Sequence, residues 1–155
     1  MTNRPALFRS ALVAATTADL RHRRRALDSF HAVILAGMLP LFLGALLTDI
    51  AYAKTHHIQW QNFGSWLITG GLVFCGIALV CALVGLFRGW RDGRGILYVL
   101  LVVATFVVGV FNALAHAKDA WAMMPEGVVL SAIVLVLALL ATWIGFVSWR
   151  TGGDA

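Results

Sequence analysis

The sequence predicts an all-α membrane protein with four transmembrane helices. Of its 155 residues, 61% are hydrophobic, whereas a soluble domain has about 45–50%. Four long apolar runs cover residues 30–52, 65–87, 95–117 and 127–148, and a helix needs about 20 such residues to cross the hydrocarbon core. Lipid offers no partners to exposed backbone groups, so each run is expected to be helical. The short connections favour an antiparallel, up-down-up-down bundle.

The expected organisation is one membrane domain with two short flanking segments. Residues 1–29 form a basic N-terminal segment, 30–149 the four-span domain and 150–155 a tail. The first segment is no secretory signal, because its dense charge at 21–25 follows its weakly apolar part. Its apolar residues have helical spacing, which fits a helix on the membrane surface, and a disordered tail is the alternative. No internal repeat is evident in the sequence.

The distribution of positive charge predicts the topology. Lys54 and Lys118 are the only Lys or Arg residues in the first and third connections, and ten arginines occupy the other segments. These ten are Arg4, Arg9, Arg21, Arg23, Arg24, Arg25, Arg88, Arg91, Arg94 and Arg150. Because cytoplasmic loops are rich in Lys and Arg, both termini and the middle loop are expected in the cytoplasm of a bacterial cell, with the protein in the inner membrane. The formal net charge of +5 therefore needs no nucleic-acid partner.

Each predicted span carries a stripe of small or polar residues. Such stripes allow close approach of helices and hydrogen bonds between them, so they are expected to face inward. The stripes are Gly37, Gly44 and Thr48 in the first span; Gly71, Cys75, Ala78, Ala82 and Gly85 in the second; Thr105, Gly109, Asn112 and His116 in the third; and Ser131, Ala138, Thr142 and Gly145 in the fourth. Cys75 and Cys81 lie on different helix faces, which excludes a disulfide between them.

Ionisable residues within spans are candidate functional residues. His31 begins the first span, and Asp49 follows about 27 Å further along the helix. By the same count Asn112 and His116 lie at the end of the bundle that holds Asp49. The predicted polar rim at this periplasmic end consists of Asp49, His56, His57, Asn112, His116 and Asp119.

Three interpretations of the rim compete. A transition metal is one, with ligands among Asp49, His56, His57, His116 and Asp119, and with sulfur from Met123 and Met124 for copper(I). A proton or quinone site at Asp49 and His116 is the second. The favoured third interpretation is a hydrogen-bonded polar cap that sets helix register. No cofactor is predicted, and haem and copper are the alternatives; His31 and His116 lie at opposite ends, so a haem would need a ligand from another chain.

Catalytic motifs are missing from the sequence: it has no HExxH helix and no glycine-rich phosphate loop. The leading functional hypothesis is a non-enzymatic structural or accessory component of an envelope or electron-transfer system. Its expected partners are the lipid bilayer and other membrane subunits or a second copy. The alternative is a metal- or cofactor-binding redox or transport module that uses the rim.

Several segments resemble a family of bacterial membrane proteins, domain of unknown function 2231. The residues are Pro40-Leu41-x-x-Gly44-Ala45-Leu46-x-Thr48-Asp49, Trp66-Leu67 with Gly71-Leu72, and Phe111-Asn112-Ala113-x-x-His116-x-x-Asp119. The resemblance covers about residues 29–147 and implies four spans in the inner membrane. It adds weight to His31, Asp49, Asn112 and His116 without assigning them a role. Ala32 and Leu39 differ from the His-Pro and Phe-Pro pairs that many members carry.

Overall fold

The computed structural model describes residues 4–87, 93–118 and 122–151, with side chains for 29–87, 93–118 and 122–147. It contains four helices in these ranges: α1 (Arg4–Thr55), α2 (Ile58–Phe87), α3 (Gly93–His116) and α4 (Glu126–Thr151). Each contains a stretch long and apolar enough to cross a membrane: Ser29–Thr55, Ile58–Phe87, Gly93–His116 and Glu126–Val147. The prediction of four helices that are long and apolar enough to span a membrane is confirmed.

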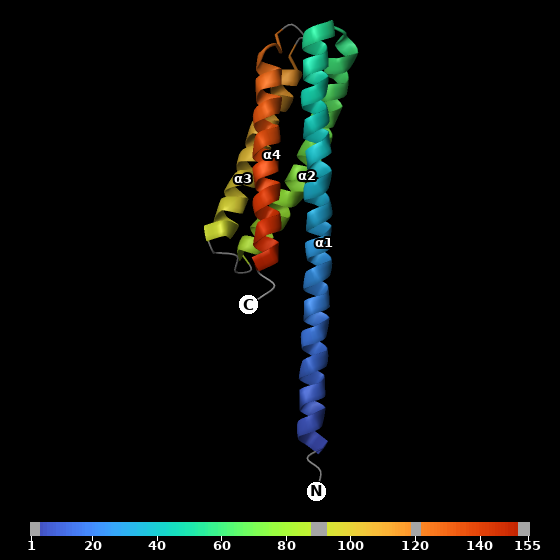
Figure 1. Ribbon diagram of the computed structural model, residues 1–155, viewed down its shortest axis with the longest axis vertical. Helices are drawn as coiled ribbons and strands as arrows, with labels where there is room; N and C mark the ends of the chain where they lie inside the picture. The colour runs from blue at the N-terminus through green and yellow to red at the C-terminus, as the bar shows by residue number, and fades with distance from the viewer. Residues whose placement is uncertain (1–3, 88–92, 119–121, 152–155) are drawn as a thin grey trace.

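The helices pack as the predicted antiparallel bundle (Figure 1). α1 lies against α2 and α4, and α3 lies against the same two helices. α1 and α3 are therefore diagonal partners that run in the same direction. Pro125 precedes α4 and Glu126 opens it, as expected for a helix start, where negative charge is favoured.

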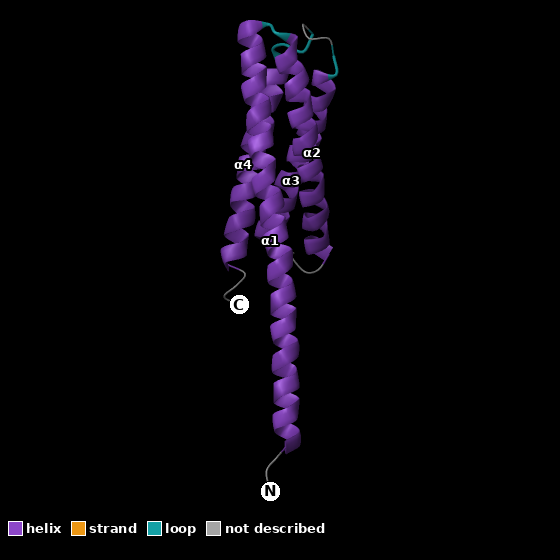
Figure 2. Cartoon of the chain, turned by 90° about the vertical axis from the view of Figure 1, so that its right-hand side faces the viewer, coloured by secondary structure: helices purple, strands orange, loops and turns teal. Residues whose placement is uncertain are grey.

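α1 is much longer than its membrane span. The helix starts at Arg4 and continues without a break into the bundle, so residues 4–28 project beyond the other helices (Figure 2). Of the two alternatives for this segment, the helix is observed, as a straight continuation of α1 and not as a separate surface helix. The basic segment is thus helical and continuous with the first span.

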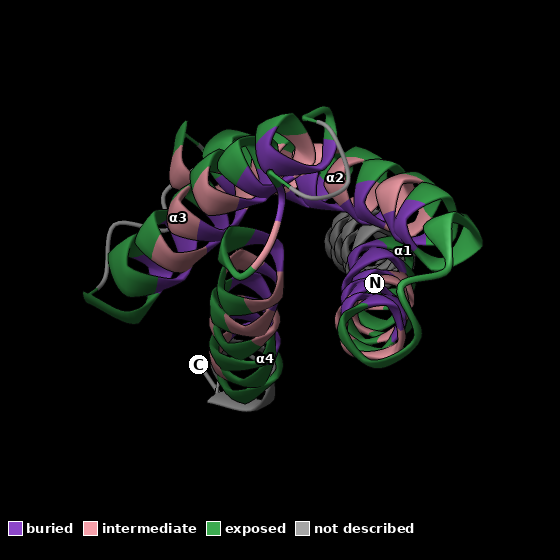
Figure 3. Cartoon of the chain, turned by 90° about the horizontal axis from the view of Figure 1, so that it is seen from above, coloured by how far each residue is buried: buried purple, intermediate pink, exposed green. Residues whose placement is uncertain are grey.

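The small and polar stripes face inward, as predicted, in α2, α3 and α4. Every stripe residue of α3 and α4 is buried, and in α2 only Gly85 is partly exposed. In α1, Thr48 is buried, while Gly37 and Gly44 are half-buried against Phe74 and Leu67 of α2. Figure 3 shows the buried sides of the four helices turned toward one another. Cys75 and Cys81 are both free thiols, as predicted.

The pattern of burial repeats after 67 residues. Residues 31–49 of α1 and 98–116 of α3 alternate between buried and exposed positions in nearly the same order, as do 62–75 of α2 and 129–142 of α4. The α1–α2 and α3–α4 hairpins therefore present equivalent faces to the core. The sequence hides this repeat, because equivalent positions carry different residues: Asp49 corresponds to His116, and Gly64 to Ser131.

Candidate functional site

A ring of four hydrogen-bonded side chains lies inside the loop-capped end of the bundle. Its residues are Asp49 of α1, Asn112 and His116 of α3, and Ser131 of α4, and we call it the polar ring. Asp49 Oδ1 lies 2.8 Å from His116 Nε2, and Ser131 Oγ donates to Asp49 Oδ2 at 2.5 Å. Asp49 has an exposed fraction of 0%. A carboxyl group with this burial must be matched by close partners.

Asn112 closes the ring. Its Nδ2 donates to Ser131 Oγ at 2.9 Å, and its backbone carbonyl accepts a bond from His116 Nδ1 at 2.9 Å. The ring therefore joins α1, α3 and α4. It links the diagonal helices α1 and α3 directly, although their backbones do not touch.

The hydrogen-bond directions define where the protons lie. The Asn112 carbonyl can only accept, so His116 Nδ1 carries a proton. A second proton must lie between His116 Nε2 and Asp49 Oδ1, because two lone pairs would otherwise face each other at 2.8 Å. Asp49 and His116 together are thus electrically neutral. Neutrality makes the pair compatible with a low-dielectric interior.

Glycines allow the neighbouring helix ends to approach the ring. A Cβ atom on Gly64 of α2 would lie 2.9 Å from Thr48 Oγ1 and 3.2 Å from Asp49 Oδ1. A Cβ atom on Gly127 of α4 would lie 2.9 Å from Met123 Cγ and 3.3 Å from His116 Cε1. Met123 has an exposed fraction of 0%, so it covers the ring from the loop side.

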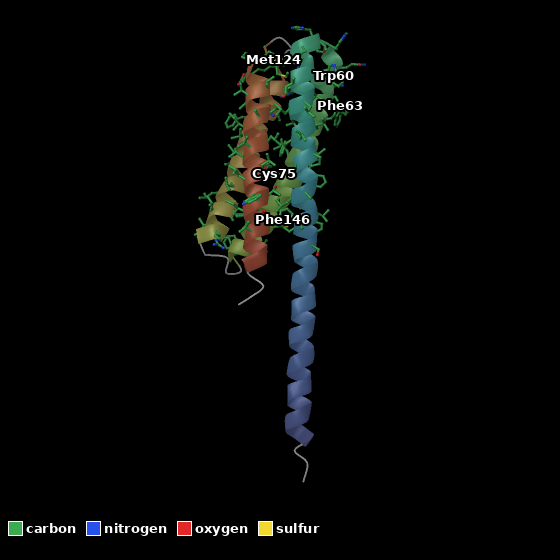
Figure 4. The ribbon with its side chains drawn as sticks, viewed as in Figure 1. Trp60, Phe63, Cys75, Met124 and Phe146 are labelled. Carbon is green, nitrogen blue, oxygen red and sulfur yellow. The ribbon has the colours of Figure 1, made fainter. Side chains whose placement is uncertain are left out.

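Gln61 of α2 completes the cover. Its Nε2 donates to the backbone oxygens of His116 and Lys118, at 3.4 and 3.3 Å. These bonds satisfy carbonyl groups at the C-terminal end of α3, which have no partner within the helix. On the surface beside it, Lys118 and Glu126 form an exposed ion pair at 2.7 Å, the kind that contributes little stability. Figure 4 labels Trp60, Phe63 and Met124 at this same end.

A second polar contact joins α1 to α3 at the opposite end of the bundle. His31 Nε2 and the Tyr98 hydroxyl lie 2.6 Å apart and are buried, with their rings in an edge-to-face arrangement. This contact and the Asp49–His116 bond both join residues 67 positions apart. His31 and Asp49 are five helical turns apart on one face of α1, and Tyr98 and His116 match them on α3. The two contacts therefore hold the same register at both ends.

The structure gathers only part of the predicted rim. Asp49, Asn112 and His116 come together, whereas His56 and His57 are exposed in the connection between α1 and α2. His56 has a φ of 56° and its amide bonds to the Tyr52 carbonyl at 2.8 Å, so it ends α1 in a left-handed conformation. Asp119 lies outside the described residues. Among the residues whose side chains are described, 29–87, 93–118 and 122–147, no three His, Cys, Asp or Glu residues are placed to hold a metal ion.

Sequence reasoning missed four residues that build the two polar contacts and their surroundings. Ser131 was expected only as a member of an inward stripe, and Tyr98, Gln61 and Gly64 were not expected to contribute. The available signal was small: Gln61 and Tyr98 are polar groups near the ends of apolar helices. Their partners lie 55 and 67 positions away, and helical periodicity carries no information at that distance.

Fold and site together define a class: a multi-pass membrane protein built as a four-helix antiparallel bundle with a buried polar ring near one end. Comparison with protein families also indicates a membrane protein. The model of the predicted membrane protein family DUF2231 matches residues 27–153, so the chain belongs to this family. Neither the curated proteins nor the solved structures provide a significant match.

Proposed function

We propose that this chain is a non-enzymatic structural or accessory component of a bacterial envelope or electron-transfer system, resident in the inner membrane. The single observation that supports this proposal best is the closed polar ring. Both oxygens of Asp49 and both ring nitrogens of His116 are already bound to protein groups. These four atoms of Asp49 and His116 thus help to hold α1, α3 and α4 together.

Burial of the ring supports the same proposal. Asp49 and Asn112 have no exposed surface, and Ser131 and His116 have 1% and 5%. A substrate or a ligand would need Met123, Gln61 or the start of α4 to move before it could reach these side chains. A bundle whose helices are held together by internal hydrogen bonds suits a scaffolding or accessory subunit, because the partners of such a subunit recognise its outer surface.

Charge placement supports the proposed orientation. Arg94 at the start of α3 and the arginine-rich segment of α1 lie at the end of the bundle opposite the polar ring. Cytoplasmic loops carry the excess of Lys and Arg. We therefore orient the polar ring toward the periplasm and both termini toward the cytoplasm.

The direct test is extraction of the tagged protein from its native membrane in a mild detergent. We expect it to migrate on native gels in an assembly larger than a single chain, together with other membrane subunits. The purified protein is then analysed for metals and by visible spectroscopy. A stoichiometric metal, or a Soret band from haem, would contradict the proposal and favour the cofactor-binding alternative. Migration of the extracted protein as a single chain would also contradict the proposal.

A further inference from the structure

The contacts between the two hairpins follow an approximate two-fold axis along the centre of the bundle. A residue on such an axis contacts its own equivalent, and α1 and α3 run in the same direction, as this axis requires (Figure 1). A Cβ atom on Gly109 would lie 4.0 Å from Phe42 Cζ, and these residues are 67 positions apart, like the two polar pairs. The three axis pairs, His31–Tyr98, Phe42–Gly109 and Asp49–His116, extend over about 27 Å of helix.

Contacts away from the axis are reciprocal, as two-fold symmetry also requires. Gly64 of α2 lies against His116 of the other hairpin, where a Cβ atom would be 3.7 Å from Nε2. The equivalent of Gly64 is Ser131 of α4, which donates to Asp49 of the first hairpin. The two-fold relation therefore includes all four helices.

The residues that face each other on the axis are complementary. Phe42 extends over Gly109, the carboxyl group of Asp49 faces the imidazole of His116, and the third pair joins an imidazole to a phenol. Two copies of the first hairpin would oppose two phenylalanines and two carboxyl groups. Two copies of the second hairpin would oppose two glycines, with a cavity between them, and two imidazoles.

We propose that the inner face of each hairpin is a docking surface specific for a helical hairpin of the other kind, and that the axis residues exclude a second hairpin of the same kind. The chain is then a fused heterodimer of two hairpins. Overpacking, a cavity or a pair of buried carboxyl groups destabilises the pairing of like hairpins, and specificity requires such unfavourable contacts as well as favourable ones. This pairing is independent of the partner subunits proposed above.

An exchange of residues across the axis tests this pairing in the full-length chain. Phe42 packs on Gly71 of its own hairpin, where a Cβ atom would lie 2.6 Å from the ring, and the equivalent of Gly71 is the buried Ala138. The complete exchange is therefore Phe42→Gly, Gly71→Ala, Gly109→Phe and Ala138→Gly, which leaves the composition of the chain unchanged. The first two substitutions alone oppose two glycines, and the last two alone oppose two phenylalanines.

We expect the first half-exchange to lower the folded-to-unfolded ratio at least about 100-fold, because it leaves a cavity. The second should lower it by a similar factor, because a second ring overpacks the core. The complete exchange should recover to within about tenfold of the wild type, as volume-conserving changes in a core do. Reversible unfolding in mixed micelles measures the ratio. Phe42→Gly with Gly145→Phe is the matched control, which also preserves composition but joins positions that are not equivalent, so it should not recover.

The His31–Tyr98 pair provides a second, independent exchange. A Cβ atom on Gly145 would lie 3.1 Å from Tyr98 Cε2, and the equivalent of Gly145 is the buried Ala78. The complete exchange is therefore His31→Tyr, Ala78→Gly, Tyr98→His and Gly145→Ala. We expect its folded-to-unfolded ratio to exceed that of either half-exchange at least about tenfold, the size of coupling that contacting residues show.

Recovery by either complete exchange, without recovery in the control, supports the proposal, because one axis relates both pairs. Circular dichroism checks folding, and a variant that does not fold counts as one that has not recovered. If neither complete exchange is more stable than its own half-exchanges, the hairpins do not dock by a two-fold relation and the proposal is wrong. Equal recovery in the Gly145→Phe control would overturn it as well.

Discussion

Asp49 is the residue whose environment determines the rest of the site. A carboxyl group in an apolar bundle is costly unless close partners match its charge and its hydrogen bonds. His116 and Ser131 provide these partners, one to each oxygen. The residue is therefore best described as one half of a neutral pair, and its substitutions should separate the effect of charge from that of hydrogen bonding.

Asp49→Asn should be much milder than Asp49→Ala. An asparagine amide can donate to His116 Nε2 of a neutral imidazole and accept from Ser131, so we expect a loss of about 1 kcal/mol. Alanine leaves both partners buried and unpaired, and we expect a loss of about 3 kcal/mol or more. The free energy of unfolding in mixed micelles measures the difference.

The matched control for this pair of variants is Glu126→Gln, which removes a carboxylate from an exposed ion pair. Its effect should stay within about 1 kcal/mol. If Asp49→Asn proved as damaging as Asp49→Ala, the ionised carboxylate would be required, and the neutral pair would consist of an aspartate and a protonated histidine.

Gly64 is the second residue at which a small change should have a large effect. A Cβ atom there would lie 2.9 Å from Thr48 Oγ1, which is fixed by its bond to the Ala45 carbonyl. Gly64→Ala should therefore destabilise the protein by about 1–3 kcal/mol. Gly70→Ala on the same helix is the control, because its Cβ atom would meet Leu41 at 3.5 Å, an ordinary contact.

The two glycine variants are compared by the same unfolding measurement. Alanine favours a helix over glycine by about 1 kcal/mol, so Gly70→Ala should be neutral or stabilising. Equal responses at the two positions would mean that α2 does not approach the polar ring as closely as the structure shows.

At the scale of elements, composition and periodicity were sufficient to predict the four helices. Each span is long enough to cross the membrane, and lipid leaves the backbone no other conformation. The stripes also identified the inward faces, because close packing needs small residues whatever the partner helix is. What periodicity did not predict is the straight extension of α1 through residues 4–28, since polar sequence outside the membrane is compatible with both helix and coil.

The end of α1 has a left-handed backbone conformation at His56 that the residue type did not predict. His56 and His57 form an adjacent pair that suggested ligands, but His56 adopts a φ of 56° in a two-residue connection. A left-handed conformation costs a residue with a Cβ atom about 1–2 kcal/mol, and glycine avoids this cost. His56→Gly should therefore stabilise the protein by about 1 kcal/mol.

The neighbouring residue supplies the control. His57 has no positive φ, so His57→Gly should be neutral or destabilise by about 0.5–1 kcal/mol, as glycine does in an ordinary conformation. Thermal unfolding in detergent compares the two variants. A loss of stability for His56→Gly would show that its imidazole forms interactions that outweigh the backbone conformation.

At the scale of the whole molecule, the two hairpins form a repeat that is visible only in the structure. The Asp49–His116 and His31–Tyr98 contacts each join a residue to its own equivalent in the other hairpin. Both contacts therefore lie where the two hairpins meet, along the centre of the bundle. The sequence placed Asp49, Asn112 and His116 at one end by counting helical rise, but pairing across the bundle depends on the register between helices. That register is a tertiary property, and this explains why Ser131 and Tyr98 were missed.

The proposed orientation of the bundle leads to the last prediction. Thr55 ends α1 and the exposed Ala122 precedes α4 at the same end of the bundle, while Arg91 belongs to the connection before α3. In a background with Cys75 and Cys81 replaced by alanine, single cysteines at Thr55 and Ala122 should react with a membrane-impermeant reagent in intact cells. A cysteine at Arg91 should react only after the membrane is opened, because loops rich in Lys and Arg remain in the cytoplasm.

If Thr55 and Ala122 label from opposite sides, the antiparallel bundle itself is wrong. If all three labels are reversed together, the bundle stands and only its orientation changes, which would place the polar ring on the cytoplasmic side.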